Sequence, residues 1–344
     1  MMKPAVQALY ISAVFLLSFP PHVNAQTKTT RAADMQLLAV QVGLDRAGFS
    51  PGEIDGRGGP KTRVALSEFQ KSANLQPTGV VNEETLGALR VSAEPVVDYT
   101  ITPQDVAGPF IDAVPTDMME SAKLQVLAYT SPLEAIAEKF HASPALMTAL
   151  NPTATWAAGE TIKVPAVEPF EIPVKTEAAG NKAAAGAKPA PDATPAPEAK
   201  GTSGSKPAGV EVIVTGATKS LTVRDASGKT LMYAPVTIGS SKDPLPVGDW
   251  KVTGVSWNPT FNYNPDLFWD ADPTHAKAKI PAGPNNPVGV VWVDISKEHF
   301  GLHGTPEPST IGRTESHGCI RLSNWDATRL GRLVGPGTKV TIQK

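Results

Sequence analysis

The chain contains one cysteine, Cys319, which lies in the stretch SHGCIRL at residues 316–322. The nearby residues Ser316, His317 and Arg321 are too polar for a buried strand, which argues against a purely structural role for the thiol. A free thiol is only a few per cent ionised at neutral pH, and a nearby imidazole can take its proton. His303 precedes the thiol by about fifteen intervening residues, enough for a strand end and a loop to bring the two together. The pair predicts nucleophilic catalysis.

Gly318 directly precedes the thiol and allows a tight turn of the backbone at that point. Successive N–H groups can then point at a carbonyl oxygen that gains negative charge, and each such donor is worth about 3–4 kcal/mol in acyl transfer. A metal site is not expected, because the residues between His299 and His303 indicate a strand end and no carboxylate has matching spacing. We therefore expect neither a metal ion nor an organic cofactor.

The first 25 residues have the features of a secretory signal peptide. An apolar segment at residues 8–19 follows Lys3, and small residues stand at the cleavage positions 23–25. An uncleaved anchor is the alternative. No other segment is long and apolar enough to span a bilayer, so we expect export to the periplasm without stable membrane insertion. A lone cysteine cannot form an internal disulfide in that oxidising compartment, which favours a chemical use for Cys319.

The formal net charge of −2 and the lack of long charged blocks give no indication of nucleic acid as a partner. Apolar residues at helical spacing, tight glycine turns and a capping Asn82 predict a small three-helix domain over residues 32–90. Two further short helices and a strand predict a small α+β module over residues 123–166. Residues 168–208 are rich in Ala, Pro, Lys and Gly, which indicates a disordered linker.

Residues 210–343 alternate between apolar and polar side chains in the manner of strands, with prolines and glycines between the segments. Asp225 to Gly228 predict a hairpin turn, and residues 325–333 predict a short helix. This part is therefore expected to be a mainly β domain. The fold class is multidomain: a small three-helix domain, a small α+β module and a mainly β domain that carries the cysteine.

The motifs HGT at 303–305 and SHGCIRL at 316–322, with PAGPNNPVGVVWVDISKEHFGLHG before them, resemble the catalytic domain of the L,D-transpeptidases, the YkuD family. The resemblance implies that Cys319 is the nucleophile and His303 the general base. His317 is the alternative base, but relatives can carry another residue at its position. The resemblance also implies that the backbone N–H groups of His317, Gly318 and Cys319 bind the oxyanion. It implies further that the carbonyl of Gly304 orients the imidazole of His303.

Four residues are predicted to contact the substrate. Arg321 lies two residues past the nucleophile and has the planar fork that binds a carboxylate, with a structural ion pair as the alternative. Ser316 belongs to the same motif. Trp257 and Trp269 belong to an aromatic loop at residues 256–270, which is expected to form a lid or a groove wall. The alternative for these aromatic side chains is a place in the core.

The other two modules also resemble known families. Residues 32–90 resemble a peptidoglycan-binding domain, through Ile54-Asp55-Gly56, Gly59-Pro60-Lys61-Thr62, Phe69-Gln70 and Thr78-Gly79. Residues 123–166 resemble a LysM glycan-binding module, in particular through Leu150-Asn151-Pro152 and Ile162-Lys163-Val164-Pro165. In this chain Thr130-Ser131-Pro132 stands where such modules usually carry Gly-Asp-Thr beside the sugar, so the resemblance implies the fold and leaves glycan binding open.

The resemblance implies a peptidoglycan L,D-transpeptidase associated with the cell wall. Cys319 would attack the tetrapeptide stem, release D-alanine and pass the acyl group to an amine. The expected partners are stem peptides and glycan, and a lipoprotein lysine is one of several possible acceptors, with a neighbouring stem, a D-amino acid and water. The alternatives are a carboxypeptidase or endopeptidase with the same site, and a wall-binding protein without activity, against which the intact cysteine and histidine argue.

Overall fold

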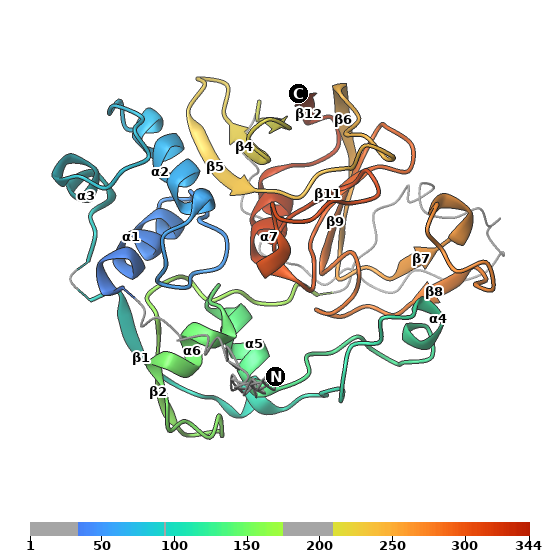
Figure 1. Cartoon of the computed structure of the whole chain (residues 1–344), viewed down its shortest axis with the longest axis horizontal. Helices are drawn as coiled ribbons and strands as arrows, with labels where there is room; N and C mark the ends of the chain where they lie inside the picture. Colours follow the sequence, from blue (N-terminus) through green and yellow to red (C-terminus); the bar gives the residue numbers. More distant parts are fainter. Residues whose placement is uncertain (1–33, 93, 175–208) are drawn as a thin grey trace, which may run out of the picture. The chain divides into compact units, whose positions relative to one another are not determined.

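The computed structural model describes residues 34–92, 94–174 and 209–344 (Figure 1). The predicted signal peptide and most of the predicted linker lie outside these residues. The predicted start of the linker at residue 168 is wrong, because Phe170 is buried in the core of the large sheet and its N–H donates to the carbonyl of Lys139. Within the described ranges, no helix has the length and apolar character needed to cross a membrane.

The predicted three-helix domain is present and consists of α1 (Met35–Arg46), α2 (Pro60–Ser72) and α3 (Glu83–Leu89). The side chains of Asp34 and Asn82 accept hydrogen bonds from the first turns of α1 and α3, which satisfies N–H groups that a helix end leaves unpaired. Apolar residues of the three helices form one buried cluster, which includes Val40, Leu44 and Phe69.

The second module contains a two-stranded sheet as well as the two predicted helices. Its strands β1 (Val96–Thr100) and β2 (Thr161–Pro165) pair antiparallel and flank α5 (Pro132–Lys139) and α6 (Pro144–Leu150). The predicted start of this module at residue 123 is therefore too late, because β1 supplies half of its sheet. Between β1 and α5 the chain forms a short 3-10 turn (Pro103–Val106) and the one-turn helix α4 (Met118–Ser121).

The predicted mainly β domain is built on one eight-stranded sheet with the order β11-β10-β9-β6-β12-β3-β4-β5. Two of its neighbouring pairs, β12 with β3 and β10 with β11, are parallel, and the others are antiparallel. The strands are β3 (Glu211–Thr215), β4 (Ser220–Arg224), β5 (Thr230–Pro235), β6 (Gly248–Trp257), β9 (Val291–Ile295), β10 (Gly301–His303), β11 (Ile320–Arg321) and β12 (Lys339–Gln343).

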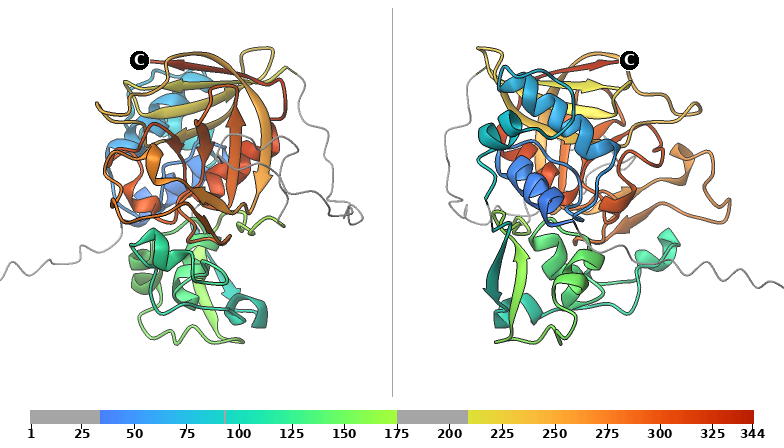
Figure 2. Two further views of the ribbon diagram at one scale, coloured as in Figure 1. Left: turned by 90° about the vertical axis from the view of Figure 1, so that its right-hand side faces the viewer. Right: turned by 60° about the vertical axis from the view of Figure 1, so that its left-hand side comes forward.

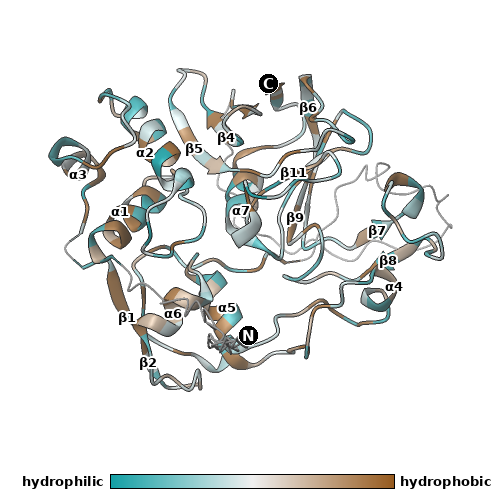
Figure 3. Ribbon diagram, viewed as in Figure 1, coloured by the Kyte–Doolittle hydropathy of each residue, from teal (hydrophilic) through white to brown (hydrophobic). Residues whose placement is uncertain are grey.

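Helix α7 (Asn324–Leu333) begins just after β11 and packs against β9 and β10 (Figure 2). Apolar and polar residues alternate around α7 and α2 in Figure 3, as expected for helices with one buried side. A separate hairpin, β7 (Phe261–Tyr263) with β8 (Ala278–Ile280), lies beyond the edge of the large sheet. We call residues 261–280 the flap.

A buried polar cluster joins the two upstream modules to α7. The carboxylate of Asp45 on α1 lies 3.1 Å from His141 Nδ1 in the second module and 3.2 Å from Arg329 Nη2 on α7. The His141 ring stacks on Trp325 of α7, with 5.2 Å between ring centroids. Burial by itself would raise the pKa of Asp45, but His141 and Arg329 outweigh it and lower that pKa to about 2.

Replacement of Asp45 by alanine should destabilise the protein by about 3 kcal/mol, because it removes the carboxylate that both the buried His141 and the half-buried Arg329 contact, and leaves Arg329 with only the more distant Asp326. The contribution of Asp45 is present above its ordinary pKa of 3.8 and is lost as the pH falls towards 2, since the folded state holds the lower pKa. Urea unfolding at pH 7 measures the difference. Lys163→Ala, which breaks the exposed pair with Asp98, is the matched control and should change stability by about 0.5 kcal/mol or less.

Candidate active site

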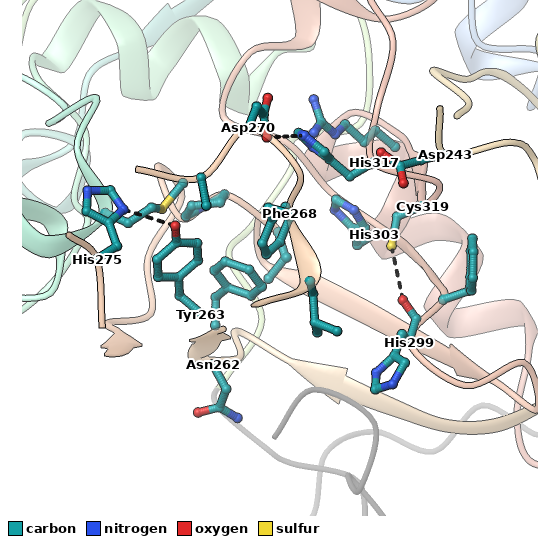
Figure 4. A pocket seen from close by; sticks show the side chains of 18 of the residues that line it. Asp243, Asn262, Tyr263, Phe268, Asp270, His275, His299, His303, His317 and Cys319 are labelled. Carbon is teal, nitrogen blue, oxygen red and sulfur yellow. Dashed lines mark hydrogen bonds and ion pairs between the residues drawn. The ribbon is translucent and has the colours of Figure 1, made fainter. Parts of the chain in front are cut away.

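The register of two short strands places the predicted nucleophile and base on one face. Strand β11 pairs in parallel with β10, with Leu302 opposite Ile320 and His303 opposite Arg321. Cys319 immediately precedes β11, and alternate residues along a strand share a face, so the thiol lies on the same side as Arg321 and His303. Both predicted catalytic side chains line one cavity of about 520 Å³ (Figure 4).

The imidazole of His303 is held in one orientation. Its Nδ1 lies 2.7 Å from the carbonyl oxygen of Gly304, and its ring stacks on Trp292 with 5.2 Å between centroids. A carbonyl can only accept, so Nδ1 carries the proton and Nε2 keeps its lone pair. Burial of the ring, followed by the positive charge of Arg321, lowers the pKa of His303 to about 3. His303 is therefore a neutral imidazole at physiological pH, in the tautomer that a base requires.

The thiol of Cys319 is also neutral at rest. Cys319 is half-buried, and its Sγ lies 3.8 Å from the carbonyl oxygen of His299. Burial raises the pKa of the thiol above its ordinary value of 9.0. The site therefore holds a neutral thiol and a neutral imidazole, and the proton has to move as the sulfur attacks. General-base catalysis, without a preformed ion pair, fits these two protonation states.

Glycine is required at position 318, directly before Cys319. Gly318 has φ of +99°, and a Cβ at this position would lie 2.5 Å from a ring carbon of Phe300. Ser316 closes the turn from within, because its hydroxyl donates to the carbonyl of Cys319 at 2.6 Å. Among the described residues, no backbone acceptor is recorded for the N–H groups at positions 317–319. These are the N–H groups that, by the resemblance to the L,D-transpeptidases, are predicted to bind the oxyanion.

Of the four residues predicted to contact the substrate, Arg321 lines the cavity and the other three do not. The positive charge of Arg321 acts there on both His303 and Cys319. Ser316 is buried in the turn and does not line the cavity. Trp257 is wrong as a cavity residue, because its ring packs on the sheet core against Gly331 of α7. Trp269 lies outside the cavity lining with 57% exposure, and its Nε1 donates to Asp243 at 2.8 Å.

The cavity lining includes Tyr263 and Asp270 of the predicted aromatic loop 256–270, and also His275, which was not predicted as a site residue. Asp270 of the flap lies 2.8 Å from His317 Nε2, next to the nucleophile. His275 Nδ1 lies 3.0 Å from the hydroxyl of Tyr263, and its Nε2 lies 3.1 Å from Asp117 of the second module. Figure 4 shows Tyr263 and His275 on the side of the cavity away from Cys319. No motif relates Asp117 to His275, because the two are 158 positions apart.

Asn324, another residue without a sequence signal, supports the segment around His303. Its Oδ1 accepts from the N–H of Val290, and its Nδ2 donates to Glu138 of α5 at 2.8 Å. A Cβ on Gly304 would lie 2.2 Å from the same Oδ1, so the backbone beside His303 passes directly over this amide. The carbonyl that orients His303 is thus placed by contact with α7.

Comparison with known proteins gives two family matches. Residues 209–342 match the YkuD model, described as "L,D-transpeptidase catalytic domain", and residues 35–89 match the model described as "Putative peptidoglycan binding domain". The matched ranges are the cysteine-bearing domain with its sheet and the three-helix domain. The YkuD range contains Cys319, His303 and every other residue to which the motif assigns a catalytic role.

Curated relatives carry the corresponding names. The chain is 32% identical over 136 residues to "Putative L,D-transpeptidase YkuD" of Bacillus licheniformis, which covers 40% of this chain and 66% of the relative. It is 30% identical over 135 residues to "Probable L,D-transpeptidase YbiS" of Escherichia coli, which covers 38% of this chain and 43% of the relative. With the Bacillus subtilis YkuD protein it shares 46% identity over 61 residues, 18% of this chain and 37% of the relative.

Solved structures with similarity to this chain include an L,D-transpeptidase from Mycobacterium smegmatis, with 22% identity, a TM-score of 0.32 and coverage of 39% of this chain and 58% of the other. The chain spans from about a third to two thirds of the length of the three curated relatives. On the family matches, the chain contains a catalytic domain of the L,D-transpeptidase (YkuD) family at residues 209–342 and a peptidoglycan-binding domain at residues 35–89.

Proposed function

We propose that this protein is an exported peptidoglycan L,D-transpeptidase that uses Cys319 as its nucleophile. The observation that carries the proposal is the state of His303: a buried, neutral imidazole with Nδ1 bonded to Gly304 and Nε2 available, in the same cavity as the only thiol. A base in the correct tautomer beside a nucleophile meets the first requirement for acyl transfer. The cavity volume of about 520 Å³ suits part of a peptide.

In the first step the sulfur of Cys319 attacks the carbonyl of the third residue of a tetrapeptide stem. The thiol proton passes to Nε2 of His303 as the carbon–sulfur bond forms. The carbonyl oxygen becomes an oxyanion that accepts from the N–H groups at positions 317–319. When the intermediate collapses, the peptide bond breaks, the imidazolium returns the proton to the leaving amine, and D-alanine departs. The stem stays on Cys319 as a thioester.

In the second step an amine attacks the thioester. His303 takes a proton from the attacking nitrogen, and the carbon–sulfur bond breaks, which returns the thiol once the sulfur regains a proton. A neighbouring stem as acceptor gives a 3→3 cross-link, a lipoprotein lysine gives an anchored protein, and water gives a carboxypeptidase. Arg321 is the cation of the cavity and suits a carboxylate of the donor stem.

The upstream modules support the same substrate. A peptidoglycan-binding domain that contacts α7 would hold the catalytic domain near its polymeric substrate and raise the local concentration of stems. Export would deliver the protein to that polymer, and we propose the periplasm as its location, on the signal-peptide features of the first 25 residues. The resemblance of the second module to a LysM domain remains a prediction.

Intact mass spectrometry with a carbapenem should give a single covalent adduct, because the activated thiol attacks the strained lactam carbonyl. Cys319→Ala should abolish the adduct. His303→Ala should slow its formation by about 10²- to 10⁴-fold, the usual contribution of a general base. A folded protein with a free thiol and no adduct would contradict the proposal and favour a wall-binding protein without activity.

The rate of carbapenem acylation should stay nearly constant from about pH 5 to pH 8. The pKa of His303 is lowered to about 3, so the base stays unprotonated throughout this range and is lost only as the pH falls towards 3. The thiol ionises only above its ordinary value of 9.0. Stopped-flow kinetics across this range tests the expectation. An inflection near pH 6.5 would instead indicate an exposed histidine or an ion pair at rest.

A further inference from the structure

One segment of the second module leaves that module and reaches the active-site cavity. Residues 111–128 begin and end together, since the N–H of Ile111 donates to the carbonyl of Tyr129 at 3.0 Å. We call these residues the strap. It contains α4, whose N-cap Asp117 accepts from the N–H groups of Met119 and Glu120 through Oδ1.

The C-terminal end of the strap binds to the PAGPNNP segment at residues 281–287. The N–H of Leu127 donates to Ala282, and its carbonyl accepts from the N–H of Asn285, both at 3.0 Å. The side chain of Asn285 donates to the carbonyl of Ala128 at 2.8 Å. Gly283 has φ of +141°, and a Cβ there would lie 2.2 Å from the carbonyl oxygen of Leu127. The glycine and the asparagine of this segment thus allow the strap to approach closely.

The strap also packs on the flap. Leu127 forms a buried cluster with Tyr263 and Ile280, and further apolar residues of the strap, Met118, Ala122 and Leu124, pack against that cluster. At the polar edge of this contact, Asp117 Oδ2 lies 3.1 Å from Nε2 of His275. His275 in turn holds the hydroxyl of Tyr263 through Nδ1 at 3.0 Å. The flap is therefore tied to the strap by an apolar cluster and by one hydrogen-bonded chain.

The strap is part of the cavity wall as well. Thr116 and Met118 line the same cavity as Cys319 and His303. The other end of the flap loop is tied beside the nucleophile, where Asp270 contacts His317. Figure 4 shows His275 and the Asp270–His317 contact on different sides of the cavity, with Phe268 between them. A peptide that extends from the thiol towards His275 would meet the strap at the far end.

We propose that the strap forms the distal wall of the peptide cleft, and that Asp117 is a positioning residue that fixes the flap through His275. This inference rests on the proposed function and adds where the substrate is held. At this end of the cavity the strap contributes the hydroxyl of Thr116 and the thioether of Met118, and the flap contributes the phenol ring of Tyr263. These groups suit the backbone of a peptide and an aliphatic side chain remote from the reacting bond. A fixed wall lowers the cost of ordering a long substrate and does nothing for a ligand that occupies only the thiol end.

The test measures D-alanine release from a disaccharide-tetrapeptide and from an N-acylated diamino acid–D-alanine dipeptide, together with carbapenem acylation. Asp117→Asn keeps an oxygen for the α4 cap and removes the charged acceptor of His275. It should raise KM for the tetrapeptide about tenfold with kcat little changed, and leave the dipeptide and the carbapenem within about twofold. Met118→Ala, which shortens the wall without touching the hydrogen-bonded chain, should act in the same direction.

Lys123→Ala is the matched control, because Lys123 lies on the strap, pairs with the exposed Glu120 and is not among the residues that line the cavity. It should leave all three reactions unchanged. An unchanged KM for the tetrapeptide in both Asp117→Asn and Met118→Ala would overturn the inference. An equal loss of reaction rate with the tetrapeptide, the dipeptide and the carbapenem would also overturn it, because it would indicate that the strap only supports the fold. A wild-type protein that the carbapenem does not acylate would overturn the proposed function itself, and the inference with it.

Discussion

The parallel ladder between β10 and β11 is very short, with two residue pairs, yet it sets the distance between Cys319 and His303, the proposed nucleophile and base. Neither strand would be stable alone: β11 lies at the edge of the sheet, and β10 lies between it and β9. Their register is held from three sides: by β9, which pairs with β10, by Thr237, which exchanges hydrogen bonds with Arg321, and by α7 beneath. A slip of one residue would turn Cys319 away from His303, because side-chain direction alternates along a strand.

Support for this edge comes from beyond the catalytic domain. The amide of Asn324 lies against Gly304 on one side and bonds to Glu138 of the second module on the other. Burial raises the pKa of Glu138 to about 7, so this carboxyl is partly protonated near neutral pH and its desolvation is less costly. The second module therefore contacts the catalytic domain at two places that matter for the site: below His303 through Glu138, and at the far wall of the cavity through the strap.

Cys319 and His303 are desolvated and lie near one cation, Arg321. Burial keeps both Cys319 and His303 uncharged at rest, and this protects a lone thiol from ionisation and hence from oxidation. In the proposed reaction, charge appears only as the sulfur attacks, when the N–H groups at positions 317–319 and the imidazole ring can stabilise it in a desolvated site. Arg321 lowers the pKa of His303 further, so the same cation that suits a substrate carboxylate also keeps the base unprotonated.

The sequence alone predicted that Cys319, Gly318 and His303 belong to one site, because they lie in short motifs recognised by residue type and local spacing; their chemical roles stay a proposal. The three helices of the first domain and most strands of the large sheet follow from local periodicity in the same way. Only the tertiary structure decided which aromatic residues reach the cavity, where the second module begins, and how Asp117 and Asn324 contribute. These depend on pairs such as Asp117 with His275, which no local pattern marks, since neither partner has an unusual neighbourhood in the sequence.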